Sequence, residues 1–214
     1  MKRESGGGPG ESGVRGEGAH GAPALVVPRR RDRAREDDWV RAFLDRAVWG
    51  TLAVPSSDGP PHVNTNLFVR AGDPERLYVH TARTGALADL VAAAGDRGVP
   101  ASFTAAAFGR LLPAETALGF SIEYAAVVVR GRLRVVRDAA EAVDALHLLV
   151  HRYAPHLERG RDYAAVTPEE LKRTAVYRLD VEAWSGKQKA VGAHAGAFTP
   201  AGVTVPFEVA GSGS

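Results

Sequence analysis

The segment 77–87 has the residue types of an anion-binding corner. Apolar and larger polar residues alternate up to His80, small and polar residues follow, and a helix is expected next. A helix start offers unpaired N–H groups and partial positive charge, which favour an anion by about 0.3–1 kcal/mol. Thr81, Arg83 and Thr84 add hydroxyls and a permanent cation. The segment therefore suits a terminal phosphate, although Thr84 as a plain helix cap and Arg83 as a solvated turn residue explain it equally simply.

A second unusual pattern is a run of polar side chains in an expected strand. Asn64, Thr65 and Asn66 are consecutive within the segment His62–Val69, and asparagine is depleted in strands. Amides and hydroxyls lining one face of a barrel could read the edge of a planar ring system. An exposed edge strand is the alternative interpretation.

Histidines supply the remaining candidate chemistry. His80 ends its strand beside the polar turn, where it could donate a proton near neutral pH, and a hydrogen-bonded structural histidine is the alternative. His147 and His151 are four residues apart, a spacing that can present two imidazoles to one metal. The intervening Leu-Leu-Val lacks the glutamate of a metalloprotease helix, so we expect a surface or packing role and no metal site.

Composition excludes several classes of function. The 214 residues include no cysteine, which rules out disulfides and zinc–thiolate sites, and 45% are hydrophobic, as in an ordinary globular protein. The net charge is +2, whereas residues 1–34 alone hold seven basic and four acidic residues, so the remainder is near neutral. We therefore expect no nucleic-acid groove, no signal peptide, no membrane span and a cytoplasmic location.

The elements that must position these residues follow from hydrophobic period and turn signals. We expect a disordered tail over 1–34, one domain over 35–190 and a second tail over 191–214. Helices are expected from Glu36, over Gly85–Ala94 and Asp138–Tyr153, and from Thr167, and strands over Val48–Val54, His62–Val69, Arg76–Thr81, Val99–Ala106, Ser121–Val136 and Ala175–Val181. Short hairpin connections predict a mainly β (α+β) domain, a six-stranded antiparallel barrel with peripheral helices.

Motifs spread through residues 36–190 in a fixed order resemble a known family. A hairpin carrying His-Val-Asn is followed by Leu-Tyr-Val-His-Thr-Ala-Arg-Thr-Gly and a helix, a Ser-Phe strand, a Val-Val-Val-Arg-Gly-Arg strand, and Trp-Ser-Gly-Lys-Gln-Lys. This series is similar to the pyridoxamine 5'-phosphate oxidase-related flavoproteins, particularly their nitroimidazole reductase-like branch. The resemblance implies a split β-barrel and a homodimer that holds FMN at its interface, with contacts from both chains.

The resemblance also implies which residues touch the cofactor. Asn64, Thr65 and Asn66 match the strand along the flavin ring, and His80 and Thr81 match positions beside the ring and ribityl chain. Arg83 and Thr84 match the phosphate turn. Ser102 and Phe103 match a strand that borders the cofactor, and Trp184 and Lys187 match a C-terminal segment that reaches the partner's cofactor. Gly186 would permit a tight turn that brings Lys187 onto a phosphate.

Two departures from the family pattern bear on the cofactor. Ala86 stands where the family usually has Lys or Arg, and Ala126 where it tends to have Ser. Phosphate binding would then depend on Arg83, or on Arg130 or Lys187, and deazaflavin, haem or an empty pocket stay open as alternatives. We expect an FMN-dependent oxidoreductase acting on a small molecule, with His80 as its catalytic residue. The alternatives are a non-enzymatic flavin- or haem-binding or sensing module of the same fold, and a dimerisation domain.

Overall fold

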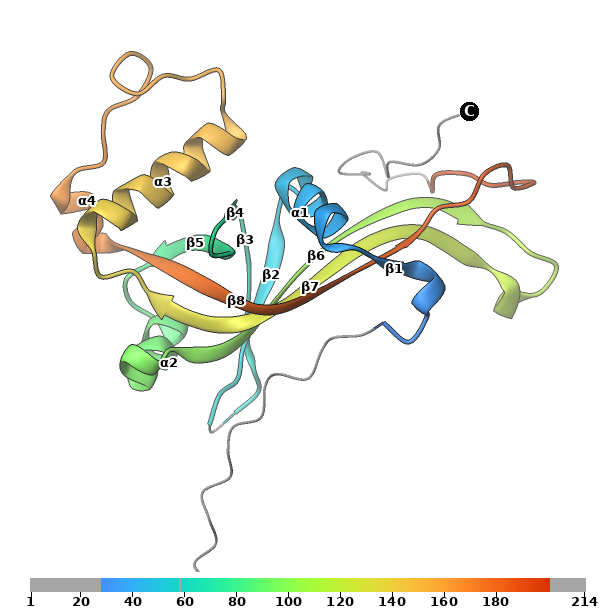
Figure 1. The fold of residues 1–214 in the computed structure, drawn as a ribbon, viewed down its shortest axis with the longest axis horizontal. Coiled ribbons are helices and arrows are strands. Elements are labelled where there is room, and N and C mark those ends of the chain that lie inside the picture. The colour runs from blue at the N-terminus through green and yellow to red at the C-terminus, as the bar shows by residue number, and fades with distance from the viewer. Residues whose placement is uncertain (1–27, 58, 201–214) are drawn as a thin grey trace, which may run out of the picture.

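A curled antiparallel sheet forms the body of the chain (Figure 1). The computed structural model describes residues 28–57 and 59–200. The strands follow the order β3-β2-β6-β7-β8-β5-β4, and β1 pairs with β8. Their bounds are β1 Ala34–Arg35, β2 Gly50–Val54, β3 His62–Asn66, β4 Val69–Ala71, β5 Arg76–Ala82, β6 Val99–Leu112, β7 Ser121–Val135 and β8 Thr174–Lys189. The half-barrel confirms the predicted split barrel class.

The structure has eight strands in its described part, where the sequence predicted six. One addition is the short β1. The other arises because the predicted strand His62–Val69 divides into β3 and β4. At the division, the Tyr153 hydroxyl accepts from the Phe68 N–H at 3.1 Å and donates to the Phe68 carbonyl at 2.9 Å. These bonds take the place of ladder bonds, so the chain can leave one sheet edge and join the other.

Glycine 131 shapes the bend of the sheet. The register between β7 and β8 shifts between Arg130 and Gly131, and a glycine inside an apolar strand is typical of such a bulge. A Cβ at position 131 would lie 1.9 Å from the Asp180 carbonyl oxygen. Only glycine allows this approach of the two backbones where the register shifts.

The main core lies on the inner face of the curl. Helix α1 (Asp37–Arg46) contributes Phe43 and Leu44, and α2 (Ala86–Ala94) contributes Leu87 and Val91. The sheet contributes alternate residues, among them Phe103. Because successive strand residues point to opposite faces of the sheet, the residues between these core positions lie on the other face.

A second, smaller core forms where α3 (Ala139–Tyr153) packs on the outer side of β4 and β5. The Asp138 carboxylate accepts from Ala140 N–H at 2.7 Å and so caps α3, at the start of the helix predicted over Asp138–Tyr153. Helix α4 (Pro168–Arg173) begins with a capping box between Thr167 and Glu170, and this predicted helix start is also confirmed.

The C-terminal part of the sheet is longer than the sequence predicted. Strand β8 continues to Lys189, whereas the prediction ended at Val181. The predicted tight turn at Gly186 is wrong, since Gly186 lies in the strand and a Cβ there would lie 2.8–2.9 Å from Val40 and Trp39 of α1. Gly186 therefore serves helix packing. Strand β6 likewise extends through Leu112, whereas the predicted strand ended at Ala106.

Structure begins and ends beyond the predicted domain limits. A 3-10 turn, Arg31–Arg33, and β1 occupy the end of the segment predicted as a tail. Residues 190–200 run beside β6, where Phe198 bridges to Leu111. Residues 1–27 and 201–214, which hold most of the two predicted tails, lie outside the described residues. None of the helices in the described ranges is long and apolar enough to cross a membrane.

Candidate functional site

One face of the sheet carries no helix in the described structure, and we call it the open sheet face. It is formed by the outward residues of β2, β3, β6, β7 and β8, namely Thr51, Ala53, Val63, Thr65, Ser102, Thr104, Ala106, Ala126, Val128, Arg130, Ser185 and Lys187. Most of these side chains are small. A flat ligand could therefore lie close to the strands across this face.

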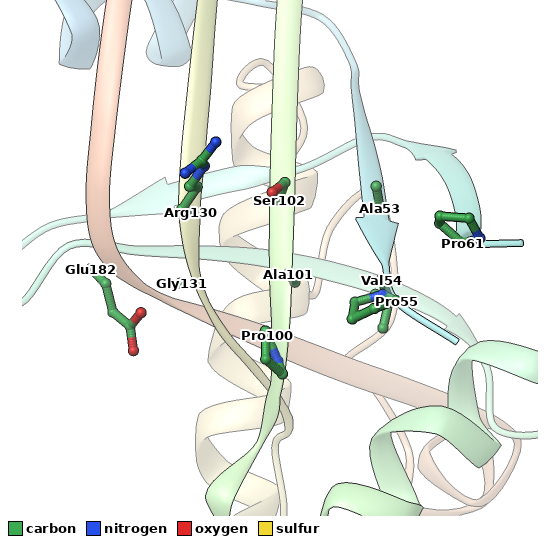
Figure 2. Close-up of a pocket in the computed structure, with 10 residues that line it drawn as sticks. All are labelled: Ala53, Val54, Pro55, Pro61, Pro100, Ala101, Ser102, Arg130, Gly131 and Glu182. Carbon is green, nitrogen blue, oxygen red and sulfur yellow. The ribbon is translucent and has the colours of Figure 1, made fainter. Parts of the chain in front are cut away.

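A pocket of about 410 Å³ opens on this face (Figure 2). Ala53, Ser102 and Arg130 are direct neighbours across β2, β6 and β7, since Ala53 pairs with Ser102 and Ser102 with Arg130. Pro55, Pro61 and Pro100 close one end, and Gly131 and Glu182 complete the wall. Adjacent strands are about 4.8 Å apart, so this row spans about 10 Å. The volume falls within the usual range of about 300–1,000 Å³ for ligand pockets.

Arg130 is the free cation of this pocket. Its side chain is exposed and forms no ion pair with any residue in the described ranges. Glu182, the acid of the pocket, instead pairs with Arg132, whose Nε lies 3.4 Å from Glu182 Oε1. Figure 2 shows Arg130 and Glu182 pointing in opposite directions. An anionic group beside Ser102 would therefore meet Arg130 rather than the carboxylate.

The predicted phosphate cation, Arg83, is already engaged. Its Nη2 and Nε donate to the Leu171 carbonyl at 2.7 and 3.1 Å, and its backbone N–H donates to the Arg173 carbonyl at 2.9 Å. These carbonyls belong to the C-terminal turn of α4, where a cation is favourable. Arg83 therefore anchors α4 to β5.

Thr84 does not cap a helix. The N-cap of α2 is Gly85, with φ of +114°, and no side chain caps this helix. Its first-turn N–H groups are thus not taken by a side chain. The role of Thr84 at a phosphate stays a prediction, as does that of Arg83.

The polar run on β3 divides between two faces because successive strand residues point in opposite directions. Thr65 lies on the open sheet face, and its hydroxyl is 3.1 Å from that of Thr51. Asn64 and Asn66 point to the inner side, and the Asn66 side-chain nitrogen is buried without a hydrogen-bond partner. Because β3 ends the sheet, this strand is also the edge strand of the alternative interpretation.

His80 and Thr81 lie in a different pocket, between β5 and α3. The wall of that pocket desolvates the His80 imidazole and lowers its pKa below 6.5, even though the residue keeps more than a third of its surface exposed. The Thr81 hydroxyl donates to the Ala82 carbonyl at 2.9 Å. Within the described chain, these residues therefore do not share a pocket with Ser102.

Three other predicted residues have structural contacts. Phe103 is 1% exposed and its ring lies 4.7 Å from that of Phe68 in the core, so only its backbone could border a cofactor. The Trp184 indole N–H donates to Asp37 at 2.8 Å. Lys187 lies on the open sheet face with its ammonium 5.5 Å from the centre of the Tyr124 ring.

Sequence reasoning did not place Arg130 and Glu182 in one pocket with three prolines. The available signal was the alternation along Ser102, Thr104 and Ala106, small residues that interleave with the buried Ala101, Phe103 and Ala105. Such alternation identifies a face without a helix on it. The described residues contain no cluster of three or more His, Cys, Asp or Glu side chains that could hold a metal ion.

Comparison with solved structures gives several similar folds. The flavocytochrome Anf3 from Azotobacter vinelandii is 24% identical with a TM-score of 0.63, and the similarity covers 77% of this chain and 73% of that one. A FAD and heme binding protein from Mycobacterium smegmatis is also 24% identical with a TM-score of 0.63, over 84% and 91%. A candidate 5-nitroimidazole antibiotic resistance protein from Bacteroides thetaiotaomicron is 16% identical with a TM-score of 0.57, over 72% and 86%.

The family assignment comes from the sequence itself. No curated protein sequence matches the chain. A family described as pyridoxamine 5'-phosphate oxidase matches residues 36–188, which include every strand from β2 to β7, the whole of the pocket in Figure 2 and nearly all of β8. The chain therefore belongs to the pyridoxamine 5'-phosphate oxidase family.

Proposed function

We propose that this protein binds a flavin, FMN, on the open sheet face and carries out a redox step on a small molecule. The observation that carries the proposal is Arg130, an unpaired cation beside the Ser102 hydroxyl in a pocket of a chain that belongs to this family. Arginine suits phosphate because its planar group donates two parallel hydrogen bonds. Arg130 then replaces the basic residue that the family usually has at position 86.

The pocket residues fit the parts of a flavin mononucleotide. The small side chains around Ala53 and Ser102 let a planar ring approach the backbone, and Arg130 balances a phosphate charge. Similar structures are named for a flavocytochrome and for a FAD and heme binding protein, which supports a flavin on this fold. When bound, a flavin supplies hydride or single-electron transfer, and the protein supplies orientation and electrostatics.

The exposed apolar side chains of the open sheet face support a homodimer. Val63 of β3 is 58% exposed, and Phe108, on the same face of the sheet in β6, is 52% exposed. A second copy of the chain would cover them and close the pocket from above. We propose that the flavin lies between the two copies, with Lys187 near the partner's cofactor.

The absorbance spectrum of the purified full-length protein, with mass spectrometry of any released cofactor, tests the proposal. We expect flavin absorbance as purified or after adding FMN. Arg130→Ala should weaken FMN binding at least about tenfold, because a hydrogen bond to a charged group contributes about 1.5–3 kcal/mol. Arg137→Ala is the matched control, since Arg137 is exposed and pairs only with the exposed Asp96 in the described structure.

Two results would count against this assignment. Protein that neither contains flavin nor takes up FMN would refute the function. If Arg83→Ala weakened FMN binding and Arg130→Ala did not, the phosphate would lie at the β5–α2 turn. Tight flavin binding without turnover of any electron donor and acceptor would favour the non-enzymatic binding or sensing module.

A further inference from the structure

A second pocket, of about 730 Å³, lies between the sheet and α3. Its volume is within the usual range of about 300–1,000 Å³ for ligand pockets and far above the roughly 30 Å³ that one water molecule occupies. Most of its wall is apolar and comes from α3 and the loop that follows, namely Leu146, Leu149, Val150, Ala164 and Val166. The pocket therefore offers space for the apolar body of an organic molecule.

The polar groups of this pocket differ in depth. His80 of β5 and Arg173, the last residue of α4, are both exposed. His147 of α3 is half-buried, and both of its ring nitrogens are closed off from solvent. A ligand that fills the pocket would thus meet a cation on the solvent side and an imidazole in the interior.

Arg173 is available to an anion. Its neighbour Lys172 pairs with Glu169 at 2.7 Å, whereas Arg173 forms no ion pair within the described part of the chain. The carboxylate of the pocket, Glu170, instead accepts from Thr167 N–H at 2.8 Å and from the Thr167 hydroxyl at 2.9 Å. These bonds, more than the nearby charge of Arg173, lower the pKa of Glu170. The guanidinium therefore keeps its donors for a ligand carboxylate, which it can bind through two parallel hydrogen bonds.

His147 requires a different kind of partner. Neither of its buried ring nitrogens has a hydrogen-bond partner in the described structure. A neutral imidazole has one donor and one acceptor nitrogen, and buried polar atoms of this kind normally have partners. The Tyr163 ring is its neighbour, with 6.2 Å between the two ring centres. A ligand hydroxyl both donates and accepts, so it can pair with either nitrogen without adding a charge to the interior.

We propose that this pocket binds an aromatic acid that carries a hydroxyl group. The carboxylate pairs with Arg173 on the solvent side, the ring lies against the apolar wall of α3, and the hydroxyl pairs with His147 in the interior. A planar body suits the pocket because the Tyr163 ring and two imidazoles line it, and a rigid ligand loses little conformational entropy on binding.

The loop between α3 and α4 is the part of the wall that admits the ligand. Between Ala154 and Thr167 the described chain has no helix and only one bridge, from Arg159 to Tyr163. Because the His147 nitrogens are closed off from solvent, the loop with Tyr163 must shift before a hydroxyl can reach them.

This acid-binding site is separate from the proposed flavin site. Glu182 in the flavin pocket and Thr174 in the second pocket are eight residues apart on β8, which corresponds to about 26 Å of strand. The inference therefore does not depend on the proposed function. Arg130→Ala should lower FMN affinity and leave binding of the acid unchanged.

Isothermal titration calorimetry of the full-length protein with three related probes tests the proposal. A hydroxynaphthoate with its two groups at opposite ends of the ring system carries both functions, naphthoate lacks the hydroxyl and naphthol lacks the carboxylate. We expect the hydroxynaphthoate to bind at one molecule per chain. Naphthoate and naphthol should each bind at least about threefold more weakly, because each loses one hydrogen-bonded group.

Substitutions assign each ligand group to one residue. Arg173→Ala should weaken the hydroxynaphthoate and naphthoate at least about fivefold and leave naphthol unchanged, since the bond to an exposed charge is partly screened. His147→Leu should weaken the hydroxynaphthoate and naphthol at least about threefold and leave naphthoate unchanged. Lys172→Ala on α4 and His151→Ala, an exposed histidine one turn further along α3, are the matched controls and should bind all three probes as the unchanged protein does.

The pattern across the probes separates direct contact from a structural role, because a variant that merely disturbs the pocket weakens all three together. The proposal is overturned if the unchanged protein binds none of the probes, or if naphthoate and naphthol bind it as tightly as the hydroxynaphthoate. It is equally overturned if Arg173→Ala and His147→Leu each weaken all three probes alike.

Discussion

Glu123 is a buried carboxylate in the long β6–β7 hairpin, and replacing it with glutamine should weaken the fold measurably. It is 6% exposed and accepts four hydrogen bonds. Arg110 supplies three of them, from its backbone N–H at 3.2 Å and from Nε and Nη2 at 2.8 Å each, and Val191 N–H supplies the fourth at 2.9 Å. Glu123→Gln removes the charge and turns an NH₂ group toward these donors.

The magnitude follows from the pKa of the carboxyl group. The hydrogen bonds and charge of Arg110 lower the pKa of Glu123 from 4.5 to about 2. At about 1.4 kcal/mol per pKa unit, this difference corresponds to about 3 kcal/mol of folding stability. Because the pKa is lower in the folded state, this contribution is complete above pH 4.5 and is lost as the pH falls from 4.5 toward 2.

Denaturant unfolding at two pH values tests this reasoning. Glu123→Gln should lower the free energy of unfolding by about 3 kcal/mol at pH 7, and by less than half of that at pH 3, where most of the contribution is already lost. Glu158→Gln is the control, since Glu158 is 67% exposed and its pair with Arg161 should contribute less than about 0.5 kcal/mol. An equal loss at both pH values, or a loss below 0.5 kcal/mol at pH 7, would refute the electrostatic account.

Three further predictions concern the bend, the helix cap and the second pocket. Gly131→Ala places a Cβ 1.9 Å from the Asp180 carbonyl oxygen, so we expect a loss of at least about 1–3 kcal/mol and a melting temperature lower by several degrees in calorimetry; an unchanged melting temperature would contradict the close approach. Asp138→Ala removes the cap of α3 and should cost about 1 kcal/mol in denaturant unfolding, whereas a cost near zero would show that the cap contributes nothing. The pKa of His80, measured by NMR titration, should lie below 6.5, so the unfolded chain binds the proton more readily and stability falls as the pH drops through 6.5; a value at or above 6.5 would contradict the desolvation.

Much of the fold was predictable because its signals are local. The capping box at Thr167 and the cap at Asp138 act within one helical turn, and both predictions hold. The bulge at Gly131 could be predicted because glycine inside an apolar strand usually marks one. The end of β8 could not, since Lys187, Gln188 and Lys189 look like a solvated run until pairing with β7 brings Gln188 into the interior.

The site depended on long-range contacts. Arg83 looks like a phosphate ligand in the sequence, but its guanidinium reaches a carbonyl 88 residues further along the chain. His147 looks like a packing histidine, and only the tertiary structure shows that it lines the same pocket as His80. The choice among Arg83, Arg130 and Lys187 could not be made from local spacing, because all three are cations near small residues.

The sequence by itself determined the antiparallel sheet, the helix starts and the family. Each of these follows from residue period, caps and motif order, which are properties of neighbouring residues. Only the tertiary structure decided which polar groups face one another. Ala53, Ser102 and Arg130 form one row because strands β2, β6 and β7 pair. Strand pairing joins residues that are far apart in the chain, and no local pattern states its register.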